Sequence, residues 1–320
     1  MITAVLFCTK AQSQLHNISV HDPVIIQQDS MYYIFCTGKG ISVWSSKNLT
    51  EWNKEKPVFD TIPWAVQEIT GFKNHVWAPD ISFYNEQYYL YYSISTFGKN
   101  NSAIGLATNK TLNKNDSNYK WIDHGKVLRS VAGKDRYNAI DPNFIIDENK
   151  TPWLTFGSFW SGIKLAQLQQ DGKAVSTTNT ELYNIASRNN KDFPMSDTSI
   201  NSAIEAPFIF KKNKYYYLFV SLGFCCRGEN STYKIAVGRS EKITGSYVDK
   251  NGIDMLHGGG TILLTGDKNW YAVGHNGVAV LNGKDYTVFH GYDTNDKGKS
   301  KLLLSELLWD ANGWPIIVNK

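Results

Sequence analysis

The sequence predicts an all-β protein that folds as a five-bladed β-propeller, and three observations support this. Tyr and Trp are frequent, with 18 and 10 copies in 320 residues, and both side chains favour strands. Short apolar runs alternate with turn-forming clusters, as expected for many short antiparallel strands. A proline that opens an apolar run recurs at positions 23, 79, 142 and 207, a spacing typical of a repeat protein. Apolar residues at helical spacing are scarce, which argues against a helical fold.

Five copies of a three- or four-stranded unit account for this repeat. The first strands are expected in "HDPVII" (21–26), "WAPDIS" (77–82), "IDPNFI" (140–145), "IEAPFI" (204–209) and "GGGTIL" (258–263). The second strands follow in "YYIFCTG", "YYLYYSIS", "WLTFGSF", "YYYLFVS" and "WYAVGHN". The third strands follow in "GISVWSS", "AIGLATN", "GIKLAQL", "KIAVGRS" and "YTVFHGY". Because the innermost strand of each blade lines the central channel, the five repeats should begin around one axis.

One domain is expected over residues 19–320. Residues 1–18 hold an apolar run from Ile2 to Cys8 followed by small residues, which indicates the remnant of an export signal or a flexible N-terminal segment. No run approaches the roughly 18 apolar residues of a membrane helix, so no membrane partner is expected. The net charge of +4 comes from interspersed charges rather than a basic block, which gives no indication of nucleic-acid binding.

The four cysteines do not form a recognisable framework. Cys8, Cys36, Cys225 and Cys226 have neither the spacing of a disulfide scaffold nor that of a zinc site. The adjacent pair Cys225 and Cys226 can form a vicinal disulfide or remain as two thiols in a pocket wall. Buried thiols are the commoner outcome, so the sequence favours two thiols.

Three acidic residues stand at the starts of predicted innermost strands. Asp22, Asp141 and Glu205 fall at matching places in the first, third and fourth repeats, and a propeller brings such places to one pocket. An ordinary turn or cap explains any one of these acids, but three at one phase of the repeat are harder to explain so. Carboxylates among aromatic side chains favour acid–base cleavage of a sugar, for which inverting glycosidases use one acid and one base.

Around these acids the chain resembles glycoside hydrolase family 43, and more narrowly the endo-arabinanases of that family. The resemblance runs from about residue 20 to "NGWPII" and covers nearly the whole chain. It rests on "HDPVII", "VWAPDISFYNEQYYLYYSISTFGKNNSAIGLATN", "IDPNFI", "TFGSFWSGIKL", "IEAPFIF", "YYYLFVSLGFCCRGENSTYKIAVGRSEKITGSY", "HGGGTILL" and "VGHNG". It implies a five-bladed propeller, inversion at the anomeric carbon, and hydrolysis of internal α-1,5-linked L-arabinofuranose bonds.

The resemblance also implies a role for each acid. Asp22 would be the general base that activates water, Glu205 the general acid, and Asp141 the residue that tunes the pKa and position of Glu205. His275 in "VGHNG" matches a histidine that helps hold a metal ion through water molecules, usually calcium. No organic cofactor is implied. The alternative to metal binding is that His275 only makes a hydrogen bond within the fifth blade.

Further sugar contacts are expected near the acids. Trp77 and Phe97 match aromatic positions that shape sugar subsites in the family. Weaker candidates, for which packing in the blades is an equal alternative, are Asn143, Ser158, Trp160, Cys225, Cys226 and Arg227. His21 is expected to orient Asp22 by a hydrogen bond rather than to bind metal. The other histidines belong to no visible constellation.

The sequence favours an endo-acting monomer whose partners are arabinan and arabino-oligosaccharides. The loops expected on the catalytic face (60–76, 95–102, 159–162 and 185–203) contain no large insertion, and no appended domain follows. The polar segment 187–203 can still close one end of a groove, so an exo-acting α-L-arabinofuranosidase or β-xylosidase is the alternative. A non-catalytic glycan-binding propeller would be expected to lack an acid, and fructan cleavage would need Asn rather than His21 before Asp22. The substrate implies a secreted or periplasmic protein.

Overall fold

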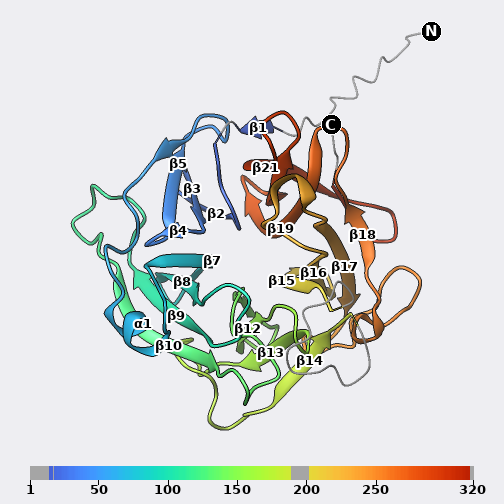
Figure 1. Ribbon diagram of the computed structural model, residues 1–320, viewed down its shortest axis with the longest axis horizontal. Coiled ribbons are helices and arrows are strands. Elements are labelled where there is room, and N and C mark those ends of the chain that lie inside the picture. The colour runs from blue at the N-terminus through green and yellow to red at the C-terminus, as the bar shows by residue number, and fades with distance from the viewer. Residues whose placement is uncertain (1–13, 17, 189–201, 318–320) are drawn as a thin grey trace.

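The five-bladed propeller is confirmed by the computed structural model, which describes residues 14–16, 18–188 and 202–317. Five antiparallel sheets stand around a central axis, and each follows the previous one in sequence (Figure 1). In each blade a short turn joins the innermost strand to the next strand, and these turns contain turn-forming residues such as Asn, Asp and Gly. No helix of the described residues is long and apolar enough to cross a membrane.

Each blade contains four main strands. Blade 1 holds β2 (Val24–Gln28), β3 (Met31–Cys36), β5 (Ser42–Ser46) and β6 (Asn53–Lys54). Blade 2 holds β7 (His75–Tyr84), β8 (Gln87–Ile94), β9 (Ser102–Asn109) and β10 (Ile122–Ser130), with β4 (Gly38–Lys39) paired to β7. Blade 3 holds β11 (Asn143–Ile146), β12 (Pro152–Phe156), β13 (Ile163–Gln167) and β14 (Leu182–Ala186). Blade 4 holds β15 (Ile204–Lys212), β16 (Tyr215–Leu222), β17 (Lys234–Ser240) and β18 (Thr261–Leu264). Blade 5 holds β19 (Trp270–Leu281), β20 (Lys284–Asp293), β21 (Lys299–Trp309) and β1 (Gln14–His16), with β22 (Pro315–Ile317) paired to β21.

The helical segments are short and lie in connections between strands. They are α1 (Pro63–Glu68), η1 (Gly228–Asn230) and η2 (Met255–His257). A proline at the start of α1 suits the first helical turn, where its missing N–H is not needed. Trp64 of α1 donates from Nε1 to Asp123 Oδ2 (3.1 Å), which fixes this helix to the outer strand of blade 2.

The ring closes through the N-terminal strand. β1 pairs antiparallel with β21, so that Gln14 lies opposite Leu304 and His16 opposite Leu302. The fifth blade is therefore built from both ends of the chain. The expected boundary between residues 18 and 19 is corrected by this pairing, because residues 14–16 belong to the propeller. The rest of the predicted export signal, residues 1–13 and 17, lies outside the described residues.

The fifth repeat begins later than the sequence pattern predicts. "GGGTIL" was expected to open blade 5, but β18 within it pairs with β17 and is the outer strand of blade 4. The innermost strand of blade 5 is β19, which includes "VGHNG". Asn276 stands there where the other four blades have proline, so the proline spacing gives no signal for this blade.

The core lies between the blades rather than inside one central mass. Each pair of neighbouring blades encloses its own cluster of buried apolar side chains, including Leu90 between blades 1 and 2 and Phe156 between blades 2 and 3. Leu218 lies between blades 3 and 4, Phe289 between blades 4 and 5, and Ile34 between blades 5 and 1. This burial holds the blades together and leaves the axis free for polar groups.

A left-handed residue accompanies every innermost strand: it lies just before the strand in blades 1 and 3 and within the strand in blades 2, 4 and 5. Its φ angle is positive in all five blades: 51° at Asp22, 42° at Ala78, 57° at Asp141, 53° at Ala206 and 52° at His275. Non-glycine residues adopt this conformation rarely and at an energetic cost. Its recurrence in every blade turns the chain toward the axis at the same point.

A polar atom of the preceding blade accepts the N–H of each left-handed residue. Thr37 Oγ1 accepts from Ala78 (2.8 Å), Ser93 Oγ from Asp141 (2.9 Å) and Ser221 Oγ from His275 (2.7 Å). Asp141 Oδ2 accepts from Ala206 (3.0 Å), and His290 Nδ1 accepts from Asp22 (3.2 Å). These bonds link each blade to the next around the axis. They satisfy buried donors that would otherwise be costly.

Candidate active site

A cavity of about 710 Å³ opens on the axis, and all five blades contribute to its wall. The side chains of Asp22, Asp141 and Glu205 line it together, as predicted from their places in the repeat. Asp22 and Asp141 are themselves left-handed residues, whereas Glu205 precedes the left-handed Ala206. Glu205 is therefore offset by one residue from the other two acids, and its side chain still reaches the same cavity.

Asp22 is buried and held by three neighbouring side chains. Its Oδ1 lies 2.9 Å from Nδ1 of His21 and 2.9 Å from Nδ1 of His275, and its Oδ2 accepts from the Thr37 hydroxyl (2.5 Å). Burial by itself raises the pKa of Asp22, but the charges of the two imidazoles outweigh burial and hold the pKa well below its ordinary value. Asp22 is therefore an ionised carboxylate at neutral pH.

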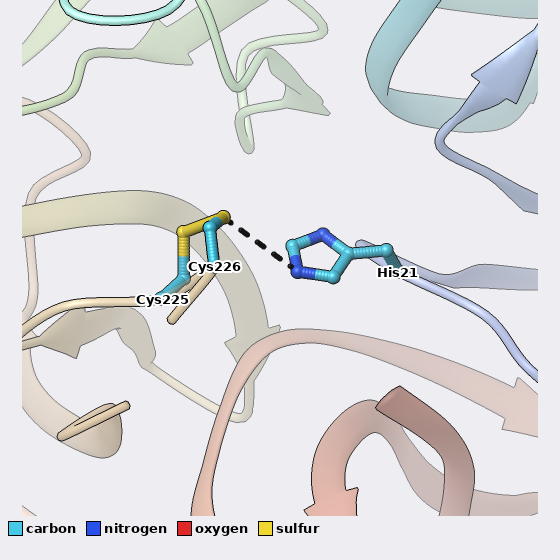
Figure 2. Close-up of side chains that lie close together, drawn as sticks. All are labelled: His21, Cys225 and Cys226. Atoms are coloured by element: carbon cyan, nitrogen blue, oxygen red, sulfur yellow. Dashed lines mark hydrogen bonds between the residues drawn. A yellow bond between two sulfur atoms is a disulfide. The ribbon is translucent and has the colours of Figure 1, made fainter. Parts of the chain in front are cut away.

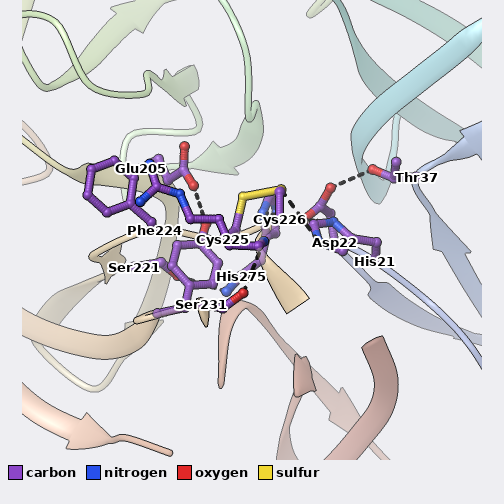
Figure 3. Close-up of a disulfide and its surroundings, with 12 residues drawn as sticks. His21, Asp22, Thr37, Glu205, Ser221, Phe224, Cys225, Cys226, Ser231 and His275 are labelled. Carbon is purple, nitrogen blue, oxygen red and sulfur yellow. Dashed lines mark hydrogen bonds and ion pairs between the residues drawn. A yellow bond between two sulfur atoms is a disulfide. The ribbon is translucent and has the colours of Figure 1, made fainter. Parts of the chain in front are cut away.

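Two of the histidines beside Asp22, His275 and His290, have opposite charge states. Burial lowers the pKa of His275, but attraction to Asp22 outweighs this and raises it to about 9, so His275 is an imidazolium at neutral pH. Burial keeps the pKa of His290 well below its ordinary value, so this ring is neutral. His21 stacks on His290 with ring centroids 4.0 Å apart. Figure 3 shows His21, Asp22 and His275 grouped on one side of the site.

Glu205 has a different environment. The Ser158 hydroxyl donates to its Oε2 (2.7 Å) and the Tyr233 hydroxyl to its Oε1 (2.7 Å). Burial raises the pKa of Glu205, and these two hydrogen bonds lower it only in part. Burial also raises the pKa of Tyr233 well above its ordinary value, so Tyr233 stays protonated and acts as a donor. Glu205 therefore holds its proton to higher pH than an exposed glutamate does.

Asp141 interacts electrostatically with both of the other acids, Asp22 and Glu205. Burial raises the pKa of Asp141 to about 8, attraction to His275 lowers it in part, and repulsion from Glu205 and Asp22 adds to the rise. Asp141 and Glu205 interact closely enough to titrate as a pair rather than separately. One ionised carboxylate and one pair that retains a proton is an arrangement suited to general base and general acid catalysis.

The profile of "Glycosyl hydrolases family 43" matches residues 15–315, nearly the whole chain. The chain belongs to this family. The family assignment agrees with the predicted resemblance, and it makes the protein a glycoside hydrolase.

Several arabinan-degrading enzymes are similar to this chain over most of their length. An extracellular exo-α-(1→5)-L-arabinofuranosidase of Cellvibrio japonicus is 43% identical over 98% of this chain and 91% of its own. An extracellular endo-α-(1→5)-L-arabinanase of Bacillus subtilis is 44% identical over 93% of this chain and 88% of its own. The solved structure of the Cellvibrio cellulosa α-L-arabinanase complexed with arabinohexaose has a TM-score of 0.87 and 43% identity, and covers 94% of this chain and 96% of that chain.

Most of the predicted sugar contacts line the family 43 cavity. Those that do so are Trp77, Phe97, Ser158, Trp160, Cys225, Cys226 and Arg227. Phe97 is 79% exposed at the rim, which no packing role explains. Asn143 is placed elsewhere: it is buried, it donates to Asp80 Oδ1 (3.3 Å) and it accepts from the N–H of Ile209 (2.8 Å). Asn143 therefore ties blades 2, 3 and 4 together and does not face the sugar cavity.

Cys225 and Cys226 form a vicinal disulfide in the cavity wall, which corrects the expectation of two thiols. The connection between β16 and β17 turns sharply here, with Cys226 at a φ of 66°, and this brings the two sulfur atoms together. The Arg227 guanidinium stacks over the Phe224 ring at 3.7 Å. The disulfide and the stacked pair all line the cavity, and Figure 3 shows Phe224 beside the disulfide.

Several site residues were missed from the sequence. His75, Tyr233 and Tyr292 line the cavity, and His290 lies behind it against His21. His75 and His290 therefore contradict the expectation that the other histidines belong to no constellation. A signal was present for His290: it lies near the end of the second strand of its blade, at a place that Ser93 occupies in blade 2 and Ser221 in blade 4.

The residues near His275 fit a metal ion held mainly through water. Nδ1 of His275 is occupied by Asp22, so Nε2 can bind an ion directly only after it releases the proton that it carries in the imidazolium form. The neighbouring Asn276 is buried, and neither its Oδ1 nor its Nδ2 has a hydrogen-bond partner, which is typical of a place for water or an ion. Among the described residues, no group of three or more His, Cys, Asp or Glu includes His275. A fully protein-coordinated calcium site, which needs six to eight oxygen ligands, does not fit.

Proposed function

We propose that the protein is an inverting endo-α-1,5-L-arabinanase. The observation that carries this proposal is the opposite tuning of two buried carboxyl groups, Asp22 and Glu205, in one cavity. An inverting glycosidase needs an ionised base and a protonated acid in the same site at the same pH. The choice of arabinan as the substrate rests on the names of the similar proteins.

Asp22 acts as the general base in this proposal. Its ionised carboxylate removes a proton from the water that attacks the anomeric carbon. His21, His275 and Thr37 bind both carboxylate oxygens and so fix the direction from which the proton is taken. The same contacts keep Asp22 ionised, which makes it available as a base over a broad pH range.

Glu205 acts as the general acid and gives its proton to the leaving sugar oxygen. The hydroxyls of Ser158 and Tyr233 each donate to one carboxyl oxygen and stabilise the carboxylate that proton transfer leaves behind. Asp141 retains a proton jointly with Glu205 and fixes the turn at Ala206. Asp141 is therefore proposed to position Glu205 and to raise its pKa.

The distribution of aromatic side chains favours cleavage inside a chain. Trp77 and Phe97 line the cavity from blade 2, and Phe159, Trp160 and Phe224 line it from blades 3 and 4. Aromatic faces bind sugar rings, and here they occur in separate sectors around the acids. Sugar units on both sides of the cleaved bond then have surfaces to bind.

An exo-acting α-L-arabinofuranosidase is the second candidate, because the similar Cellvibrio japonicus protein carries that name. Closure of one end of the groove separates the two activities. The segment 187–203, expected from the sequence to be able to close one end, falls largely outside the described residues. A sugar-binding propeller without activity is less well supported, since all three acids line the cavity. A β-xylosidase is less well supported because the names of the similar proteins refer to arabinan.

The test is a time course on linear α-1,5-arabinan, with products separated by size and the first-formed anomer identified by NMR. Intermediate oligosaccharides of inverted configuration support the endo proposal. Arabinose alone from the earliest times moves the protein to the exo class. A retained configuration contradicts the roles given to Asp22 and Glu205, and binding without cleavage leaves a carbohydrate-binding protein.

Two further parts of the proposal concern the ion and the location. A calcium ion near His275, held through water, would supply positive charge that orders water on the axis and favours ionised carboxylates. Export from the cell, as a monomer that meets its polymer outside, is consistent with the names of the two extracellular relatives.

A further inference from the structure

The vicinal disulfide contacts His21, the histidine that binds the proposed general base Asp22. Sγ of Cys226 lies 3.7 Å from Nε2 of His21, and Nδ1 of the same ring lies 2.9 Å from Asp22. Figure 2 shows the imidazole of His21 directed at the disulfide across the cavity wall. The two sulfur atoms and one ring nitrogen all lie within 4.8 Å of one another. His21 therefore joins the disulfide to the reacting part of the site.

The two ring nitrogens of His21 have different partners. Nδ1 contacts the ionised Asp22 (2.9 Å), whereas Nε2 faces Tyr292 Oη (2.9 Å) and the sulfur of Cys226, so Nε2 is the nitrogen that a metal ion would take. Tyr292 Oη also accepts the N–H of Cys226 (2.7 Å) and lies 3.3 Å from Nε2 of His290. A carboxylate behind the imidazole is the usual outer partner of a metal-bound histidine, because it orients the ring and makes the nitrogen more basic.

We propose that reduction of the Cys225–Cys226 disulfide creates a binding site for one zinc ion, with the two thiolates and Nε2 of His21 as ligands. Zinc keeps its ligands tetrahedral, with bonds of about 2.3 Å to sulfur and about 2.1 Å to nitrogen, so sulfur and nitrogen ligands stand roughly 3.6 Å apart. The observed separation of 3.7 Å between Cys226 Sγ and His21 Nε2 matches this. Water completes the fourth position, since the site opens into the cavity.

The chemistry balances with a dithiol or phosphine as reductant. Two electrons break the S–S bond and two protons are taken up: a dithiol supplies both and becomes its own disulfide, or a phosphine takes the oxygen of a water molecule, which releases the two protons, and becomes its oxide. Zinc then displaces the two thiol protons and takes the lone pair of His21, and the Tyr292 hydroxyl turns away from Nε2. The oxidised protein has no thiolate to offer here, so the site exists only after reduction.

Zinc at this position would also block hydrolysis, a consequence that rests on the proposed function. The ion would occupy the cavity wall between His21 and the Cys225–Arg227 segment, where sugar is expected. Asp22 would become the outer partner of a metal ligand and would no longer be free to activate water.

The test uses cadmium, which takes the same ligands as zinc and gives a thiolate charge-transfer absorption in the ultraviolet. Cys8→Ser serves as background, because Cys8 lies outside the described residues and its thiol would add a further metal ligand, whereas Cys36 is buried. After reduction and removal of the phosphine, we expect one equivalent of cadmium to bind. The oxidised protein should give no such band. Equal binding by the two forms overturns the proposal.

Single variants in the same background assign the ligands. Cys225→Ser, Cys226→Ser and His21→Gln should each weaken binding by about 100-fold or more, since even outer partners of a metal ligand are worth 10- to 100-fold. His257→Gln changes an exposed histidine away from the cavity and should leave the affinity unchanged. Affinity that survives His21→Gln overturns the three-ligand site.

X-ray absorption at the zinc edge of the reduced, unaltered chain provides a measurement that needs no variant. Two sulfur neighbours and one histidine nitrogen are expected, and a sulfur-only or nitrogen-only shell contradicts the site. Arabinan hydrolysis is measured separately. Zinc should inhibit the reduced form and spare the oxidised form, whereas absence of hydrolysis in both forms counts against the proposed function and not against the metal site.

Discussion

Asp22 and Glu205 are both buried, yet their pKa values are displaced in opposite directions. Burial disfavours charge on each, and the difference comes from the neighbours. Imidazole groups next to Asp22 more than offset burial, whereas Glu205 has only the hydroxyl donors of Ser158 and Tyr233, which offset it in part. Hydroxyls turn as needed and stabilise either protonation state, but a cation favours only the ionised one.

Glu205→Gln should abolish cleavage of arabinan and spare substrates that need little proton donation. General acid catalysis contributes about 10²–10⁴-fold, so kcat on arabinan should fall on the order of 10³-fold. An aryl arabinofuranoside with a very good leaving group should lose far less. The measurement is kcat on both substrates for the variant and the wild type. Full activity on arabinan would remove Glu205 from the role of acid.

The pH profile of kcat/KM should be bell-shaped. Asp22 must be ionised, and its lowered pKa places the acid limb at low pH. The acid pair must retain a proton, and the last one leaves as pH rises through the Asp141 pKa of about 8. In Asp141→Asn, Glu205 titrates without a charged partner, so the alkaline limb should move to lower pH while the acid limb stays. An unmoved alkaline limb would contradict the pairing of Asp141 with Glu205.

At this scale the sequence predicts the acids but not their partners. Asp22 and Asp141 were found because they share a phase of the repeat, and Glu205 because it lies one residue from that phase. Tyr233 and Tyr292 come from connections and outer positions whose side chains reach the axis only in three dimensions. Asn143 shows the opposite failure: a regular pleat would put it on the same face as Asp141, but the left-handed Asp141 interrupts the pleat, and Asn143 bonds to Asp80 and Ile209 instead of facing the cavity.

The elements that carry the acids are held by bonds between blades. Ser221 is fully buried and accepts the N–H of the left-handed His275 (2.7 Å). Ser221→Ala should leave this N–H without a partner, at a cost on the order of 1–3 kcal/mol. We expect a lower Tm and, because His275 loses its support, a lower kcat. Ser19→Ala is the matched control: the Ser19 hydroxyl donates to Ser300 O (3.0 Å) at the surface, where water can replace it, so an equal loss of Tm would contradict the role of Ser221.

Strand prediction succeeded where proline marked the innermost strand and failed where it was missing. Four blades begin at Pro23, Pro79, Pro142 and Pro207, and all four were placed from the sequence. In blade 5 the polar "GHNG" replaces the proline motif, and the four residues of β18 are too few for their pattern to separate an outer strand from an inner one.

At the scale of the whole molecule, β1 closes the ring by pairing with β21. Deleting residues 1–16 removes this strand and exposes an edge of blade 5 as well as its hydrogen bonds. Deleting residues 1–13 keeps the strand. We expect a lower Tm for the first truncation than for the second, measured by differential scanning calorimetry. Equal transitions would show that the pairing adds nothing to stability.

Metal removal tests whether an ion supports the site on the propeller axis. If an ion held through water near His275 supports the site, stringent chelation should lower Tm and kcat, and added calcium should restore both. The buried, unpartnered amide of Asn276 gives the reason, because loss of an ion would disturb the water that satisfies it. Unchanged Tm and kcat after chelation would contradict a role for an ion in stability or activity.

Closure through β1 also determines when the ring can be completed. Gln14 lies opposite Leu304, so almost the entire chain separates the two partners of one strand pair. Contacts this distant in sequence form slowly, because a long loop must be ordered first. During synthesis the segment that holds β1 leaves the ribosome before blades 1 to 4, whereas its partner strand β21 is made after them. Blades 1 to 4 can assemble in order as the chain emerges, while blade 5 is still incomplete. The propeller closes only after β21 has been synthesised.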